Sequence, residues 1–283
     1  MAAALKVVAI VQARMGSTRL PRKVMQTICG TPMIGLLLER LSKARRIDQI
    51  VIATSKDPRN ESLARYVSEL GFKVFRGSED DVLDRYFEAA KEAGADAVVR
   101  ITGDCPLIDA DVVDDVIREF LEAGVDYASN VSPPTYPDGL DTEVFSFHAL
   151  EEAWRRAEAP QDREHVTPYI RTGGQFTRLN HAHAEDLSDA RWTVDEPEDF
   201  EVVRRVFENF HPRRDFTWLD VQTLSTVHPE WFMANRNLVR NEGAELGSGQ
   251  KLWKRARRVI PGGNMLLSKR AEMFLPERWP AFR

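Results

Sequence analysis

The sequence predicts an α/β protein with a mostly parallel sheet and helices on both faces. Three observations support this. Short apolar runs alternate with longer segments along the chain. The longer segments carry apolar residues at helical spacing. Two of them end at a glycine, Gly71 and Gly94. Because ligands in such sheets bind beyond the carboxyl ends of the strands, the segments that follow the apolar runs are the first places to look for a site.

The first half of the chain supplies the regular alternation. Strands are expected at residues 7–13, 49–55, 73–77 and 97–104, and helices at 32–44, 60–71, 81–94 and 110–124. The second part is less regular and is expected to continue the sheet and to carry a substrate lid. There we expect strands within 142–150, 176–182 and 191–195, and helices within 148–158, 197–210 and 220–232.

Composition changes near residue 241, and this predicts the domain boundaries. Residues 1–240 form the main domain, the polar and glycine-rich residues 241–250 form a linker, and residues 251–283 form a basic segment with aromatic side chains. No core of its own is apparent for the last segment.

Bulk properties exclude several classes of protein. The chain has 283 residues and a formal net charge of −5, which argues against a general nucleic-acid binder. Its two cysteines, Cys29 and Cys105, provide neither a disulfide framework nor metal-ligand spacing, so a reduced, cytoplasmic setting is expected. The first apolar run is too short to span a membrane and is interrupted by Arg14, so no membrane partner is expected.

The segment that follows the first predicted strand, QARMGSTRLPRKVM, predicts an anion site. It holds the cations Arg14, Arg19 and Lys23 within ten residues, with Gly16 among them. A loop after a strand can offer backbone N–H groups to phosphates, and nearby cations strengthen that binding. The alternative is a solvated turn with scattered surface cations. The pattern is neither the Rossmann fingerprint nor the Walker pattern.

Two carboxylates occupy comparable positions further along. Asp104 ends the run RITGD, and Asp195 ends the strand-like run RWTVD. Asp104 can also be a turn residue or a helix cap. A helix start at EPEDF explains the acids after Pro197, but it does not explain Asp195. Two carboxylates at strand ends facing a polyphosphate loop are also what a hard divalent cation needs, because Mg²⁺ binds few protein oxygens and fills its octahedron with water and phosphate oxygens.

These motifs together resemble the cytidylyltransferase superfamily that includes CMP-Kdo synthetase and CMP-sialic acid synthetase. The resemblance is closest to the branch named after the spore-coat polysaccharide biosynthesis protein F. It rests on QARMGSTRLPRKV, TGDCPLI and RWTVDEPEDF, and also on GSEDDVLDRY, YPDGLDTEVFS and DREHVTPYI, all within residues 5–240. It implies a Rossmann-like fold of the nucleotide-diphospho-sugar transferase type and Mg²⁺-dependent transfer of CMP from CTP, with release of pyrophosphate.

The resemblance also implies residue roles. Arg19 and Lys23 hold the β- and γ-phosphates and, with Asp104, are the implied catalytic residues, while Asp104 and Asp195 hold Mg²⁺. The implied nucleotide-binding residues are Ala13, Arg14, Met15, Gly16, Ser17, Thr18, Thr102 and Gly103.

The sequence departs from the family at three positions. Arg22 stands where the family usually has a small residue such as glycine, and the sialate and Kdo enzymes differ at Thr102 and Cys105. Their base and acceptor contacts therefore cannot be copied onto this chain.

Two further segments are candidates for an acceptor site. Asp141 and Glu143, which follow the turn at Gly139, can bind hydroxyls or an amine, or else lie on a surface hairpin. Arg163 and His165 can hold a phosphate or carboxylate, or else serve a helix end or a subunit contact. The sequence is compatible with a homodimer.

The segment LWKRARRVIPGG, which begins at Leu252, resembles the opening of class III aminotransferases related to glutamate-1-semialdehyde aminomutase. Only the opening is present, so no pyridoxal phosphate site is expected in this chain. The alternative is a basic amphipathic helix that binds a partner or an acidic membrane surface.

Two functions follow as expectations. The first is a cytidylyltransferase that acts on a phosphorylated amino-polyol or a sugar acid for surface polysaccharide synthesis, with the acceptor and the choice between a CMP-linked and a CDP-linked product left open. The second is a degenerate nucleotide-binding module that docks or regulates a fused aminotransferase.

Overall fold

The computed structural model describes residues 5–236 and residue 238. Its main sheet has seven strands in the order β5-β4-β1-β6-β8-β7-β9 within these residues. The strands are β1 Val7–Gln12, β4 Gln49–Ser55, β5 Lys73–Gly77, β6 Ala97–Thr102, β7 Tyr127–Ser129, β8 Glu143–Ser146 and β9 Arg178–Asn180. β5, β4, β1 and β6 run parallel, whereas β8 is antiparallel to both β6 and β7. The predicted mostly parallel α/β sheet is confirmed.

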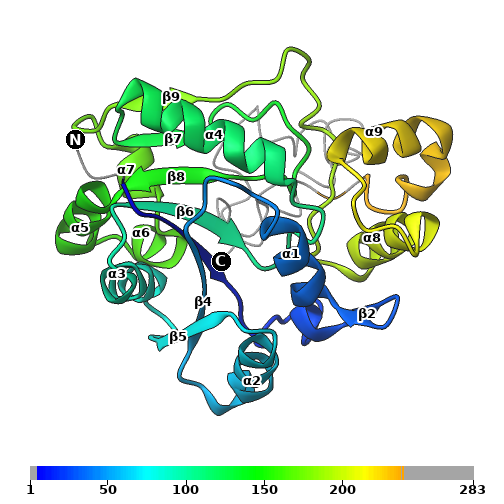
Figure 1. Ribbon diagram of the computed structural model, residues 1–283, viewed down its shortest axis with the longest axis horizontal. Coiled ribbons are helices and arrows are strands. Elements are labelled where there is room, and N and C mark those ends of the chain that lie inside the picture. Colours follow the sequence, from blue (N-terminus) through cyan, green and yellow to red (C-terminus); the bar gives the residue numbers. More distant parts are fainter. Residues whose placement is uncertain (1–4, 237, 239–283) are drawn as a thin grey trace, which may run out of the picture. The chain divides into compact units, whose positions relative to one another are not determined.

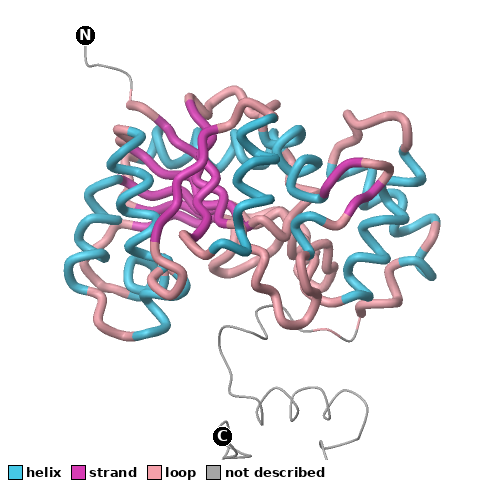
Figure 2. Tube along the Cα trace, turned by 90° about the horizontal axis from the view of Figure 1, so that it is seen from below, coloured by secondary structure: helices cyan, strands magenta, loops and turns pink. Residues whose placement is uncertain are grey.

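Helices cover both faces of the sheet, as predicted (Figures 1 and 2). They are α1 Met33–Leu41, α2 Glu61–Glu69, α3 Val82–Ala93, α4 Ala110–Ala123, α5 Phe147–Arg156, α6 Pro160–His165, α7 Pro168–Thr172, α8 Pro197–Phe210 and α9 Trp218–Val227. Short 3-10 helices occur at η1 Lys23–Met25, η2 Pro58–Asn60 and η3 Pro229–Trp231, and β2 Thr27–Ile28 pairs with β3 Thr31–Pro32 in a small hairpin. In the described part of the chain no helix is both long and apolar enough to cross a membrane.

β1 shows why the first apolar run is continuous. Val7, Ala9 and Val11 pack in the core with α1 and α4, whereas Val8 and Ile10 pack on the other face with α3 and α5. A parallel strand that is buried on both faces needs apolar residues at every position rather than at alternate ones.

The order of the strands places the functional loops. The chain leaves β1 for β4 and β5 on one side and then returns to β6 on the other side. β1 and β6 end level with each other, since Gln12 pairs with Thr102. The carboxyl ends of these two strands therefore form the point of topological reversal, where open α/β sheets bind their ligands.

The predicted strand at 191–195 is wrong. The segment forms one isolated bridge, between Asp138 and Arg191, and no strand. Its backbone is shared between two neighbours: the amide of Trp192 donates to Asp138 and the amide of Val194 donates to Asp104. Because no single partner runs alongside it, no ladder forms.

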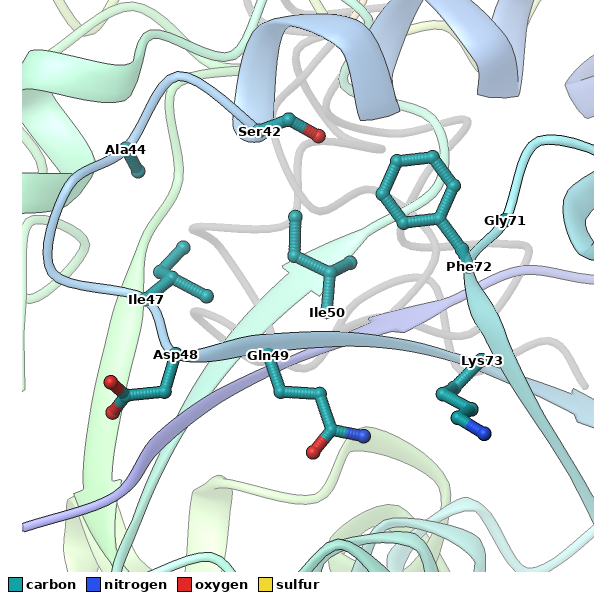
Figure 3. A pocket seen from close by; sticks show the side chains of 9 residues that line it. All are labelled: Ser42, Ala44, Ile47, Asp48, Gln49, Ile50, Gly71, Phe72 and Lys73. Carbon is teal, nitrogen blue, oxygen red and sulfur yellow. The ribbon is translucent and has the colours of Figure 1, made fainter.

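Figure 3 shows a pocket of about 280 Å³ at the amino ends of β4 and β5. Its lining includes Ile47, Ile50, Phe72 and Lys73. It lies away from the carboxyl ends where the predicted site residues gather, so it is not part of the candidate site.

Candidate active site

The loop after β1 presents backbone donors. The amide of Met15 donates to Asn60 Oδ1 at 2.8 Å, and Asn60 is held in turn by Ser55 Oγ at 2.7 Å. Among the residues that the structure describes, the amides of Gly16, Ser17 and Thr18 make no hydrogen bond to the protein backbone or side chains. Three successive amides without protein partners, next to cationic side chains, suit a phosphate group.

Lys23 links the two predicted carboxylates. Its Nζ lies 2.9 Å from Asp104 Oδ2 and 2.9 Å from Asp195 Oδ1, and it also donates to the carbonyl of Val194 at 2.8 Å. The Lys23 side chain is only 12% exposed. The structure thus brings together three residues that lie far apart in the sequence and that the sequence assigned to one site.

Two backbone contacts explain why the carboxylates meet. The amide of Val194 donates to the carbonyl of Asp104 at 2.8 Å, which ties the 191–195 segment to the turn after β6. The amide of Gly103 donates to Gln12 at 2.8 Å, and a Cβ on Gly103 would come within 2.9 Å of Ala13 Cβ. A glycine at 103 therefore allows the Asp104 turn to lie directly against the end of β1.

The residue before Lys23 has an unusual backbone conformation. Arg22 has φ 57° and ψ 25°, in the left-handed region that favours glycine. This gives a physical reason for the small residue that the family usually has at this position. In this chain an arginine adopts the same turn, which starts η1 and directs Lys23 to the carboxylates.

The charges of the site stabilise one another. Burial opposes the ionisation of Asp104, but the Lys23 charge and hydrogen bond lower its pKa to about 2. Burial likewise opposes the charge on Lys23, but Asp104 and Asp195 together raise its pKa well above the ordinary value. Both groups are therefore ionised at neutral pH.

A second layer of residues orients Asp195. Arg191, whose side chain is 6% exposed, donates to Asp195 Oδ2 at 3.2 Å and forms ion pairs with Asp138 and Asp199 at 3.0 and 2.9 Å. Asp199 also accepts from the amides of Asp195 and Glu196, which completes the capping box of α8. Because Arg191 and Asp199 are buried, the position of Asp195 is set by a charged network rather than by a strand.

Arg19 lies at the rim of this cluster. It contacts Asp195 Oδ1 at 3.1 Å and Glu196 Oε1 at 3.3 Å, and its side chain is 41% exposed. Arg14 lies nearby and contacts Glu79 at 3.4 Å. Exposed cations held only by surface ion pairs can turn to an incoming phosphate at little cost.

The structure gives each of the four predicted acceptor residues a different set of neighbours. Arg163 donates to Asp81, which caps α3, and to the carbonyl of Trp154 at 2.7 Å, so it joins α3, α5 and α6. Glu143 pairs with Arg100 at 3.0 Å.

The surroundings of the other two acceptor residues affect pKa values. His165 ends α6, and burial lowers its pKa, as do the charges of Arg100 and Arg171. Asp141 is close enough to Cys105 for its charge to raise the pKa of the thiol, after burial and Asp104.

The donor set can hold a cation. Oxygens of Asp104 and Asp195 converge on one positive charge, that of Lys23, and hard oxygen donors of this kind suit Mg²⁺. Within the described residues no group of three or more His, Cys, Asp or Glu side chains forms a metal-binding cluster. Two carboxylates alone leave most of an octahedron to water and to phosphate oxygens.

The fold and this site define a nucleotidyltransferase of Rossmann-like architecture. Residues 8–213 match the cytidylyltransferase family, and the chain belongs to that family. The predicted family and enzyme class are therefore confirmed.

Relatives and solved structures agree with this assignment. The spore coat polysaccharide biosynthesis protein SpsF of Bacillus subtilis is 32% identical over 229 residues, which cover 78% of this chain and 94% of that protein. A cytidylyltransferase structure from Leptospira borgpetersenii is similar with a TM-score of 0.78 and 31% identity, over 81% of this chain and 97% of that one. A CMP:2-keto-3-deoxy-manno-octonic acid synthetase complexed with CTP is similar in fold, with a TM-score of 0.56 and 20% identity over 72% of this chain and 99% of that one.

Sequence reasoning missed three side chains of this region: Arg191, Asp199 and Arg100. The run EPED at 196–199 did contain a signal for Asp199, because an acid at the third helical position can close a capping box. Arg100 lies inside an apolar run, where a lone charged residue signals a buried partner. Nothing in the sequence named Glu143 as that partner.

Proposed function

We propose that the protein transfers CMP from CTP to an acceptor oxygen and releases pyrophosphate, with CTP held by residues 13–19. The observation that carries the proposal is the contact of Lys23 with both Asp104 and Asp195, which Arg19 of the same loop also reaches at Asp195. Together with three loop amides that have no protein partner among the described residues, these groups supply the cations, carboxylates and amide donors that phosphoryl transfer uses.

Each residue has a proposed task. The amides of Gly16, Ser17 and Thr18 receive phosphate oxygens, with Ala13, Arg14, Met15, Thr102 and Gly103 completing the nucleotide site. Arg19 and Lys23 hold the β- and γ-phosphates and stabilise the charge of the departing pyrophosphate. Asp104 and Asp195 would hold Mg²⁺, which neutralises phosphate charge when it is bound.

The acceptor attacks the α-phosphorus in line with the leaving pyrophosphate. A phosphate acceptor is already ionised and needs no general base, whereas the attacking hydroxyl of a sugar acid does. We propose a phosphorylated amino-polyol or a sugar acid, used for a surface polysaccharide. The name of the Bacillus subtilis relative supports the pathway, and the resemblance of residues 252–263 to an aminotransferase opening supports an amino-bearing acceptor. That segment lies outside the described residues.

Two further expectations stay with the proposal. Both cysteines are free thiols, Cys105 buried and Cys29 partly so, which suits a reduced, cytoplasmic setting. CTP and a small acceptor are the proposed partners. A homodimer remains a prediction, and the mass of the protein in solution tests it.

The nucleotide preference tests the proposal. Pyrophosphate release is measured with CTP, UTP, ATP and GTP against a panel of sugar acids and polyol phosphates. UTP is the sharpest competitor, because its base edge differs by one exocyclic group. A mismatched buried polar group costs about 1–3 kcal/mol, so CTP should be preferred about tenfold to a hundredfold. Equal rates with CTP and UTP would refute cytidylyl transfer and leave a general nucleotidyltransferase.

A further inference from the structure

An ion pair lies on interior strands on the α3 face of the sheet. Arg100 is on β6, which has β1 on one side and β8 on the other, and it pairs in register with Glu143 on β8. Arg100 Nη1 donates to Glu143 Oε1 at 3.0 Å, and the two side chains are 14% and 6% exposed. Charged residues are rarely fully buried unless they are paired, and this pair is the condition for placing both charges inside the sheet.

This pair is only half satisfied. Among the described residues, Nε of Arg100 and Oε2 of Glu143 are buried without a hydrogen-bond partner. An unmade hydrogen bond on a buried polar group costs about 1–3 kcal/mol, and more when the group is charged. The pair therefore contains one buried donor and one buried acceptor, and their unmade hydrogen bonds are a cost that a hydrogen-bonding ligand would offset.

The pair lies between the carboxylates and the segment that holds Asp141. Arg100 is on β6, which ends at Thr102, two residues before Asp104. Its partner Glu143 begins β8, two residues after Asp141. The pair therefore joins the strand that leads to the proposed metal ligand to the strand that follows a proposed acceptor residue.

Solvent reaches this part of the sheet. Gln12, Arg100 and Thr102 are all partly exposed, although their strands are interior. Their neighbours Val11, Val99 and Ile101, which face the opposite layer, are fully buried. The helical layer on the α3 face therefore leaves the carboxyl ends of β1 and β6 accessible to a ligand.

The chemistry of the pair selects a class of ligand. The two charges cancel, so the pair has little attraction for an anion. It offers one N–H donor and one carboxylate acceptor, and burial keeps His165 largely uncharged near neutral pH. A donor beside an acceptor matches two adjacent polar groups of a carbon chain, such as a vicinal diol or an amino alcohol.

We propose that the Arg100–Glu143 pair is the specificity site for the acceptor and binds its vicinal diol or amino alcohol, while the end that carries the attacking oxygen points to Asp104 and the CTP loop. This inference rests on the proposed cytidylyl transfer. It adds Arg100 to the acceptor site and assigns Glu143 to the neutral part of the acceptor.

The test compares R100Q and E143Q with the wild type, using an acceptor from the panel that turns over and its analogue lacking one hydroxyl or the amine. We expect each substitution to raise the acceptor KM at least tenfold and to leave the KM for CTP within twofold. The deoxy analogue should raise the KM of the wild type about tenfold and cause no further rise in E143Q. An unchanged acceptor KM in both variants, or a full additional rise with the analogue, overturns the inference.

Two controls keep the result interpretable. E151Q removes a carboxylate of a surface ion pair, with Arg155 at 2.7 Å, and should change no kinetic constant. R100M/E143L replaces the buried pair by apolar residues of similar volume, a change that often leaves a fold intact, and should lose acceptor selectivity while CTP still binds.

Failure of the proposed function has a separate signature. If the wild type releases no pyrophosphate with any panel member, cytidylyl transfer to these acceptors is refuted. Binding of the same compounds in the presence of CTP is then measured by saturation-transfer NMR. Signals from protons on the hydroxylated carbons that are present in the wild type and lost in E143Q support the site. Signals that are absent from the wild type or unchanged in E143Q overturn it.

Discussion

At the scale of single residues, a change at Asp104 tests the proposed metal and catalytic role most directly. Asp104→Asn keeps the size of the side chain and removes its charge, while Lys23 retains Asp195 and the carbonyl of Val194. The fold should therefore persist and CTP should still bind, but turnover should fall by about a thousandfold, or ~4 kcal/mol of barrier.

Pyrophosphate release by the purified variant at ordinary Mg²⁺ checks this prediction. Asp111→Asn is the matched control, because Asp111 is a 73% exposed carboxylate on α4. Near-normal turnover of the Asp104 variant would remove Asp104 from the catalytic site.

Lys23 leads to a second prediction at the same scale. In the free protein its ammonium neutralises both Asp104 and Asp195, so a divalent cation must compete with it for the same oxygens. We expect Mn²⁺ to bind the nucleotide-free wild type weakly and Lys23→Met at least tenfold more tightly. Turnover of this variant should be lost, because the phosphates lose a cation.

Calorimetry or electron paramagnetic resonance of Mn²⁺ without nucleotide measures this affinity directly. Lys91→Met removes a 61% exposed lysine and serves as the control. Equal Mn²⁺ affinities for the Lys23 variant and the wild type would show that the two carboxylates do not form the cation site.

At the scale of elements, the tight turn at Gly139, just before the proposed acceptor residues Asp141 and Glu143, packs against the segment that carries Asp195. Gly139 has φ +116°, and a Cβ there would lie 2.7 Å from the amide nitrogen of Thr193. Hydrogen bonds from Asp138 to Ala190 and from Trp192 to Asp138 close the same contact. Gly139→Ala therefore meets both an unfavourable backbone conformation and a steric clash.

We expect Gly139→Ala to lower the free energy of unfolding by about 2–4 kcal/mol and to reduce turnover, because the segment that holds Asp195 must shift. Urea denaturation followed by circular dichroism measures the stability. Gly174→Ala is the control, since that glycine has open space around its Cβ position and no positive φ. Similar stabilities for the two variants would contradict the tight-turn argument.

At the scale of the whole molecule, the family match ends at residue 213 and every proposed site residue lies before residue 200. Ending the chain at about residue 240 should therefore leave CTP turnover within a few-fold of the full chain. It should also improve solubility, because apolar and basic side chains of the last segment are removed.

Turnover and circular dichroism of the shortened protein check this prediction, and the full chain with added pyridoxal phosphate should show no transaminase activity. A shortened protein that stays folded but loses turnover would place the last segment inside the active unit. The domain boundary at 240 would then be wrong.

The sequence by itself determined the fold class and the family of this protein, and it led to the site residues that are proposed here. Continuous apolar runs such as β1 require burial on both faces, and the motifs around Lys23, Asp104 and Asp195 lie in order along the chain. Both kinds of information are local, because each depends on residue types within one segment.

Only the tertiary structure decided which side chains meet. It showed that residues 191–195 are no strand and that Arg191 and Asp199 orient Asp195. It also showed that Arg163 is paired with Asp81, whereas Arg100 and Glu143 share a half-satisfied ion pair. The contact between Arg163 and Asp81, for example, joins residues that are 82 positions apart in the sequence. They depend on strand order and register, which bring distant charges together and which no local pattern specifies.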